Sequence, residues 1–281
     1  MSVIDRQFRT RIQQVTESER IVTWVSSYPK SGNTWVRFML LNLIYGPQRS
    51  TEHLQTRIPD IHKPLGELRV TPGSPLLIKT HFQLGPSMPL FDKTAGFIYI
   101  VRHPMDTMIS NLNYLFARHV VNKDPALNEK IKQAYIEEFI RLGGDPNWVK
   151  IGFGSWIDHV RSWVGNDPGF PSLVLRYEDL LAQPAAHLRR IADFIHIQKS
   201  SDEIETAVDH STFDRMQKIE EGELASRTPG FFMSENSETT IQAGCRFMNR
   251  GKAGEGEKEL THAQREKFQE KFGSTMEWVG Y

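Results

Sequence analysis

The chain has 281 residues and a mass of 32.4 kDa, which corresponds to about two small domains or to one large α/β domain. Apolar residues make up 39% of it and charged residues 24%, and this composition excludes a disordered or collagen-like chain. The 34 basic and 34 acidic residues cancel, so we expect no nucleic-acid partner and no bulk attraction to an anionic membrane. Any anion must be bound by a local site.

The cysteine content and the N-terminal sequence bear on the cellular compartment. Cys245 is the single cysteine, so the chain can form neither an intrachain disulfide nor a cysteine-ligated metal cluster. The first eleven residues carry four arginine or aspartate charges and do not resemble a secretion signal. The most apolar stretch, residues 35–45, is interrupted by Arg37 and Asn42 and is shorter than the roughly 18 residues of a membrane span. We therefore expect a cytoplasmic protein without a membrane span.

Four short runs rich in β-branched and aromatic residues predict buried strands. They comprise residues 21–25, 76–80, 97–101 and 173–177. The runs are continuously apolar, which is typical of strands covered on both faces, and helical patterns lie between them. No linker or repeat divides the chain. The sequence therefore predicts a single α/β domain over residues 1–281, with its core at about 20–275, in which helices flank a central parallel sheet in three layers.

Three longer segments have a less regular pattern and are expected to be loops. They comprise residues 46–75, 118–153 and 219–243. Loops of this length either face a substrate or are merely solvated, and the pattern does not decide between these roles.

The strongest chemical signal is the sequence YPKSGNTW at residues 28–35, between the first strand and a helix predicted over 34–45. Gly32 permits a tight turn there. The backbone N–H groups at the helix N-terminus, together with Lys30, Ser31 and Thr34, supply the donors of a P-loop-like phosphate site. The lysine precedes the glycine, so the pattern is not that of the nucleoside triphosphatases, and their magnesium chemistry is not implied. Taken alone, the segment equally fits a turn that caps a helix.

Two further strand ends carry polar groups. The second strand ends in Lys79 and His81, and a histidine at such an edge can accept a proton from a hydroxyl near neutral pH. The third ends at Arg102, and Ser110 lies about two turns into a helix that begins at Pro104, so both can meet a second phosphate. Each pair taken alone also fits an ordinary exposed or structural position.

Taken together, the three segments resemble the sulfotransferases of the cytosolic and bacterial type, which use 3′-phosphoadenosine-5′-phosphosulfate (PAPS). The order and spacing of the motifs match from residue 24 to about 217. In that family the loop at the position of residues 30–35 binds the 5′-phosphosulfate, and the residues at the positions of Arg102 and Ser110 bind the 3′-phosphate. His81 falls where the family has its catalytic base.

The resemblance extends to residues 154–163, 176–180 and 211–216, and less closely to residues 247–257. In this last segment many members carry Arg-Lys-Gly and then Gly-Asp-Trp, whereas this chain has Asn249 in the first motif and Gly256 at the tryptophan position. The resemblance implies that two aromatic residues enclose the adenine and that others contact the nucleoside or phosphates. The implied donor-binding residues are Lys30, Ser31, Gly32, Asn33, Thr34, Trp35, Arg102, Ser110, Tyr177, Ser211, Phe213, Arg250 and Gly251.

The activity that the resemblance implies is transfer of a sulfuryl group from PAPS to a hydroxyl of a small-molecule acceptor, with release of 3′,5′-ADP (PAP) and no metal. His81 is expected to accept the proton of the acceptor hydroxyl, and Lys30 to neutralise the leaving oxygen. Lys79 is expected to assist at the sulfonate and Ser110 to restrain Lys30. Two other functions remain open: a P-loop-type small-molecule kinase and a non-catalytic relative that only binds PAP or another nucleotide.

The acceptor is less well defined by the sequence. A phenol, a steroid-like alcohol or a natural-product hydroxyl all fit an apolar pocket, and the pattern leaves a homodimer open. Seven aromatic residues either line that pocket or belong to the core: Tyr114, Phe116, Tyr135, Phe139, Trp148, Phe231 and Phe232.

Overall fold

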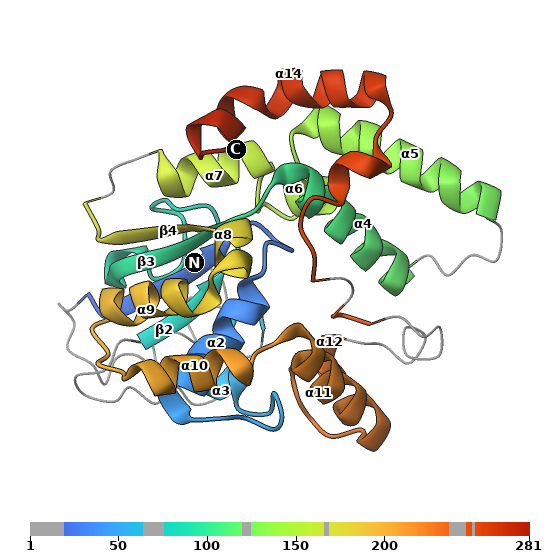
Figure 1. The fold of residues 1–281 in the computed structure, drawn as a ribbon. Helices are drawn as coiled ribbons and strands as arrows, with labels where there is room; N and C mark the ends of the chain where they lie inside the picture. Colours follow the sequence, from blue (N-terminus) through green and yellow to red (C-terminus); the bar gives the residue numbers. More distant parts are fainter. Residues whose placement is uncertain (1–19, 64–75, 120–124, 166–168, 236–245, 249–250) are drawn as a thin grey trace.

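The computed structural model describes residues 20–63, 76–119, 125–165, 169–235, 246–248 and 251–281 (Figure 1). Its centre is a parallel sheet of four strands in the order β2-β1-β3-β4. The strands are β1 (Val22–Ser27), β2 (Leu76–Thr80), β3 (Thr94–Val101) and β4 (Ser172–Arg176). The predicted parallel α/β architecture is confirmed, and each of the four apolar runs forms a strand.

Helices cover both faces of the sheet. Successive strand residues point to opposite faces, so Trp24 and Tyr99 belong to one apolar cluster while Val25 and Ile98 belong to the other. The first cluster packs under α4 (Pro104–His119), α5 (Pro125–Leu142), α7 (Trp156–Val164) and α14 (His262–Trp278). The second packs against α2 (Asn33–Tyr45), α9 (Pro184–Phe194) and α10 (Ser201–Asp209). Figure 1 shows these helices on the two sides of the sheet.

The segments expected to be loops contain several helices, which is a correction. The segment 118–153 holds all of α5 and all of α6 (Pro146–Lys150). The other two hold α3 (Leu54–Arg57), the second half of α11 (Phe213–Ser226) and α12 (Phe231–Glu235). In α5 only one face is apolar, with Ile136, Phe139 and Ile140 buried, and the many charged residues on the rest of the helix made it look irregular.

The fourth strand ends one residue earlier than predicted. Tyr177 is the first residue of α8 (Tyr177–Ala182) rather than the last residue of a strand, and Arg176 precedes it in extended conformation. The described residues also form two short 3₁₀ helices, η1 (Phe91–Lys93) and η2 (Gly256–Glu259). In the part of the chain that the structure describes, no helix is long and apolar enough to cross a membrane.

All four strands run in the same direction, so their carboxyl ends meet at one edge of the sheet. The loop after β1, the His81 position after β2, Arg102 after β3 and Tyr177 after β4 therefore converge there. Ligands of open parallel sheets bind at this edge.

Candidate active site

The loop between β1 and α2 makes a tight turn. Lys30 and Gly32 both have left-handed backbone conformations, with φ angles of 68° and 94°. A Cβ on Gly32 would lie 2.5 Å from Cδ2 of Tyr177, so this position requires glycine for both conformation and space. The Asn33 side-chain amide donates to the Val25 carbonyl at 3.1 Å and so holds the start of α2 against β1.

One buried hydroxyl group of this loop has no protein partner in the part of the chain that the structure describes. Ser31 is fully buried, and within the described part of the chain its hydroxyl oxygen has no hydrogen-bond partner. A buried hydroxyl left in this state costs about 1–3 kcal/mol. The hydroxyl lies in the loop that precedes the N-terminus of α2, where the helix dipole favours an anion. These residues therefore fit a bound phosphate or sulfate group.

Arg102 joins the loop after β1 to the C-terminal segment, residues 251–256. Its Nη1 donates to the Lys30 carbonyl at 3.1 Å, and its Nη2 donates to the Lys252 carbonyl at 2.9 Å. The guanidinium also lies over the ring of Tyr177, 4.5 Å from the ring centroid. The C-terminal segment is thereby held beside the phosphate loop.

Asp106, on the first turn of α4, fixes the same C-terminal segment. Its two carboxylate oxygens accept from the backbone N–H groups of Gly254 and Gly256, both at 2.7 Å. A Cβ on Gly256 would lie 2.4 Å from the carbonyl carbon of Met105, so no larger residue fits in this packing. Gly256 thus suits a close backbone contact that the tryptophan of the resembled family could not make.

The cavity at this edge of the sheet has a volume of about 480 Å³ and brings most of the predicted site residues together. The predicted residues that line it are Lys30, Gly32, Asn33, Thr34, Trp35, Lys79, His81, Arg102, Ser110, Tyr177, Phe213 and Gly251. Ser31, in the same loop, is fully buried and is not on the cavity wall. Arg250, like Asn249, lies outside the described residues.

Ser211 is not on the cavity wall. Its hydroxyl is buried and donates to the Ala207 carbonyl at 2.7 Å, while Asn42 donates to the same hydroxyl at 2.8 Å. Its backbone carbonyl accepts from the indole Nε1 of Trp35 at 2.8 Å. In this arrangement Ser211 orients the Trp35 ring, which does line the cavity.

His81, immediately after β2, is held in one tautomer. Its Nδ1 lies 2.7 Å from the carbonyl oxygen of Ser27, and a carbonyl can only accept. Nδ1 therefore carries the proton and Nε2 carries the lone pair. Burial, reinforced by the charge of Lys79, holds the pKa of His81 well below its usual value of 6.5, so the imidazole is neutral at pH 7. A neutral imidazole on the cavity wall with a basic Nε2 can accept a proton.

Lys79 is not an isolated cation, because it forms a buried ion pair with Asp60 at 2.8 Å. Burial lowers the pKa of Lys79 to about 8, although the carboxylate of Asp60 opposes this shift. Burial also opposes ionisation of Asp60, but the charges of Lys79 and Arg37 outweigh it and hold the pKa of Asp60 well below its ordinary value. Sequence reasoning missed Asp60, because it lies in a segment expected to be a loop and meets Lys79 only in the folded chain.

The seven aromatic candidates for the acceptor pocket divide between wall and core. Tyr114, Trp148 and Phe231 line the cavity. The side chains that belong to the core are Tyr135, Phe139 and Phe232, and Phe116 packs from a partly buried position against the apolar cluster that contains Tyr135 and Phe139. Phe153 and Phe247 also line the cavity, and the sequence analysis did not single them out.

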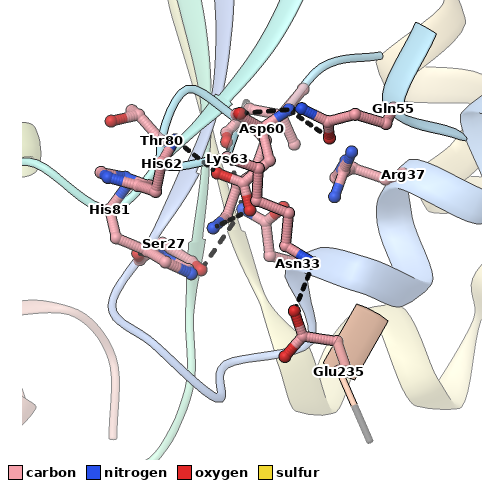
Figure 2. A network of polar contacts seen from close by, with 12 residues as sticks. Ser27, Asn33, Arg37, Gln55, Asp60, His62, Lys63, Thr80, His81 and Glu235 are labelled. Carbon is pink, nitrogen blue, oxygen red and sulfur yellow. Dashed lines mark hydrogen bonds and ion pairs between the residues drawn. The ribbon is translucent and has the colours of Figure 1, made fainter. Parts of the chain in front are cut away.

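The cavity wall also carries a charged cluster around Lys63 and Glu235. The ammonium group of Lys63 pairs with the carboxylate of Glu235, and Tyr114 donates to the same carboxylate at 3.0 Å. Lys63 also donates to the Ser234 hydroxyl at 2.8 Å, so it ties α12 to the segment that follows α3. Figure 2 shows Lys63 extending to Glu235 from the region of Asp60 and His62.

Comparison with known proteins identifies relatives over almost the whole chain. The model of the sulfotransferase domain matches residues 21–280. Sulfotransferase 1A1 of Rattus norvegicus is 27% identical over 266 residues, which cover 90% of this chain and 83% of the relative. Sulfotransferase 1 family member D1 of Mus musculus is 29% identical over 266 residues, which cover 90% and 82%.

Two solved structures share the fold. The mouse sulfotransferase SULT7A1 is 21% identical, with a TM-score of 0.63, and the match covers 98% of this chain and 91% of that one. A retinol dehydratase is 18% identical, with a TM-score of 0.66, and the match covers 95% and 86%.

Proposed function

Because the chain belongs to the sulfotransferase family, we propose that it transfers a sulfuryl group from PAPS to a hydroxyl of a small-molecule acceptor and releases PAP. One observation carries this proposal: a phosphate-binding loop and a neutral, oriented histidine line the same cavity. The first feature suits an anionic donor, and the second suits a hydroxyl that must lose its proton.

The residues present fit the donor. The backbone and side chains of residues 30–35 would hold its 5′-phosphosulfate, since Ser31 offers a buried hydroxyl with no protein partner. Arg102, Ser110 and Gly251 would hold the 3′-phosphate, and Trp35 and Phe213 would enclose the adenine beside Tyr177. Arg250 would add a charge to the 3′-phosphate site. The structures of SULT7A1 and of the retinol dehydratase were solved in complexes with PAP, which supports the choice of donor.

When bound, PAPS supplies a sulfuryl group on a good leaving group. Nε2 of His81 takes the proton from the acceptor hydroxyl as its oxygen attacks, because Nδ1 is already protonated and bound to Ser27. The Ser27 hydrogen bond also stabilises the imidazolium that forms. The ring does not need to turn during the reaction, since its orientation is set beforehand.

The two lysines provide positive charge on the donor side of the cavity. The Lys30 ammonium group lies over the rings of Tyr114 and Phe247, 4.4 and 4.0 Å from their centroids, so it is held at the junction of the donor and acceptor sides. From there it neutralises charge on the leaving oxygen. Lys79, anchored by Asp60, assists at the sulfonate, and Ser110 restrains Lys30 until the acceptor is bound.

The acceptor is a small molecule with an apolar body. The cavity walls are aromatic: Phe153, which packs against His81, is stacked with Trp148 at 5.7 Å, and Phe247, beside Lys30, packs edge to face with Phe231 at 5.0 Å. Such walls favour an aromatic or polycyclic alcohol over a polar sugar. The retinol dehydratase has been solved with retinol and with androsterone, which supports an apolar acceptor here.

The proposal is tested by binding and turnover in matched variants. PAP at about 100 times its dissociation constant is expected to stabilise the wild-type protein by roughly 2.7 kcal/mol. His81→Ala is expected to lower turnover with PAPS by a factor of about 100 to 10,000 and to leave PAP binding nearly intact. Lys30→Ala is expected to weaken both. The matched control is His262→Ala, because the His262 side chain is 87% exposed on α14.

The outcomes separate this function from the alternatives. Stabilisation by ATP with magnesium, and not by PAP, would indicate a kinase. Stabilisation by PAP with no turnover of any hydroxyl acceptor would indicate a binding protein. Near-normal turnover in His81→Ala would contradict the role of this histidine as the base.

A further inference from the structure

The backbone of His81 is bound by a second histidine on the neighbouring segment. The N–H of His81 donates to Nε2 of His62 at 2.8 Å, and the two rings are parallel, with centroids 5.8 Å apart and an interplanar angle of 11°. His62 follows a short stretch that runs beside β2, where the Ile61 N–H donates to the Lys79 carbonyl at 3.1 Å. Figure 2 shows the two histidines side by side above Ser27.

A third histidine binds the other end of the same residue. Nε2 of His159 lies 3.1 Å from the carbonyl oxygen of His81, so Nε2 is the donor, and Nδ1 accepts from the Tyr99 hydroxyl at 2.9 Å. The N–H of His81 is therefore bound by a lone pair, and its carbonyl is bound by an N–H. Each contact fixes the tautomer of the histidine that makes it.

His62 is itself held in place from several sides. Its backbone N–H donates to Oδ1 of Asp60 at 3.0 Å. Its ring packs against Phe82 and Phe153, with centroid distances of 4.5 and 4.7 Å. Burial, together with the charge of Lys79, lowers the pKa of His62 to about 3, so Nε2 keeps its lone pair at neutral pH. Nε2 of His62 therefore remains available as the hydrogen-bond acceptor for the His81 N–H at neutral pH.

We propose that His62 is a positioning residue for the base. By accepting the His81 N–H it fixes the backbone from which the imidazole projects, so that Nδ1–H remains on the Ser27 carbonyl and Nε2 faces the reacting hydroxyl. This inference rests on the proposed function, since it assigns His62 to the same proton transfer. A loop residue without a positioning role would not need to present an unprotonated imidazole nitrogen to the N–H of His81.

Two variants separate the hydrogen bond from the packing. His62→Gln keeps an acceptor oxygen at about the position of Nε2, whereas His62→Phe keeps a ring between Phe82 and Phe153 and removes the acceptor. His262→Phe is the control on the surface. All three variants are expected to bind PAP as the wild type does.

The first readout is turnover of ring-substituted phenols that differ in hydroxyl pKa. We expect His62→Phe to lower kcat by about 10-fold to 100-fold for phenols that are protonated at the assay pH, because small misplacements of a catalytic group cost this much. For phenols already ionised in solution, which need no base, the loss is expected to be within a few-fold. His62→Gln should stay within a few-fold of the wild type for both. An equal loss for all phenols, or a loss in His62→Gln as large as in His62→Phe, would overturn the inference.

The second readout does not depend on turnover. Imidazole ¹⁵N chemical shifts report the tautomer of His81, and we expect Nδ1–H in the wild type and in His62→Gln, with an added Nε2–H population in His62→Phe. If the wild type turns over no phenol, the proposed acceptor class fails, and the tautomer still decides the role of His62. If the His81 tautomer is unchanged in His62→Phe, the positioning role is wrong, and the proposed sulfotransferase function is unaffected.

Discussion

The proposed base His81 and the two neutral histidines bound to its backbone make the stability of the fold sensitive to mildly acidic pH. His159 is fully buried and His62 and His81 are partly buried, and the loss of hydration is the largest cause of the lowered pKa of each. The pKa falls to about 3 for His62 and His159, and well below 6.5 for His81. In the unfolded chain each imidazole titrates near its usual value of about 6.5.

The sign and the size of the effect follow from this difference. Below pH 6.5 the unfolded chain binds a proton at each of these positions and the folded chain does not, so the free energy of unfolding decreases as the pH falls. Between pH 6.5 and 5.5 each histidine is expected to contribute a loss of about 1 kcal/mol, or about 3 kcal/mol for the three together. Above about pH 7.5 the contribution disappears, because both states are then neutral. Carboxylates of the unfolded chain titrate mainly below pH 5 and do not obscure this interval.

Urea unfolding followed by circular dichroism at pH 7.5, 6.5 and 5.5 measures this dependence. His62→Gln serves as the matched variant, since it keeps the acceptor for His81 and removes one titrating group. Its loss of stability over the same interval is expected to be about one third smaller than that of the wild type. A wild-type loss below about 1 kcal/mol, or an identical loss in the variant, would refute the assignment of these histidines as neutral in the folded chain.

Three substitutions test the remaining contacts. Asp60→Asn leaves the buried Lys79 ammonium group without its carboxylate, so it is expected to lower the free energy of unfolding by about 3–5 kcal/mol in urea titrations. A loss under about 1 kcal/mol would contradict the ion pair. Gly32→Ala places a Cβ 2.5 Å from the Tyr177 ring at a residue whose φ is 94°. It is expected to weaken PAP binding at least about 10-fold, measured by calorimetry, and unchanged affinity would mean that the loop tolerates the side chain. Asp106→Ala leaves the N–H groups of Gly254 and Gly256 without their acceptor and should weaken PAP binding about 10-fold by the same measurement. Wild-type affinity would show that the segment around these glycines keeps its position without the carboxylate.

The sequence predicted the sheet well because its strands are covered on both faces. Residues such as Trp24 and Ile98 are fully buried on opposite sides, so the apolar run is continuous and stands out from its surroundings. Helix α5 was missed for the opposite reason. It buries one narrow face against the core and exposes its charged residues, so its average composition resembles that of a solvated loop.

Of the predicted site residues that line the cavity, those of the loop after β1, His81 and Arg102 stood out because they lie directly after strands, where sequence order and spatial order agree. Tyr177, Phe213 and Gly251 were predicted from the resemblance to the family and not from local pattern. Asp60, His62 and Asp106 could not be found in this way. Asp60 and His62 meet β2 through a backbone pairing of a non-strand segment, and Asp106 meets glycines about 150 positions away in the chain. No local periodicity encodes such contacts, because they depend on how separate segments pack.

The electrostatics of the cavity suggest how a weakly basic histidine can serve as a base. A catalytic base works best when its pKa is near the operating pH, yet the charge of Lys79 adds to burial in holding the pKa of His81 well below 6.5. An anion bound beside Lys30 and Lys79 would offset this positive charge and raise the pKa of His81 toward neutrality. Proton affinity at His81 and anion affinity at the loop are then linked, so the base gains strength when the donor is in place. With no anion bound, burial and the charge of Lys79 keep the imidazole unprotonated, and Nε2 is ready to accept the acceptor proton as soon as both ligands are present.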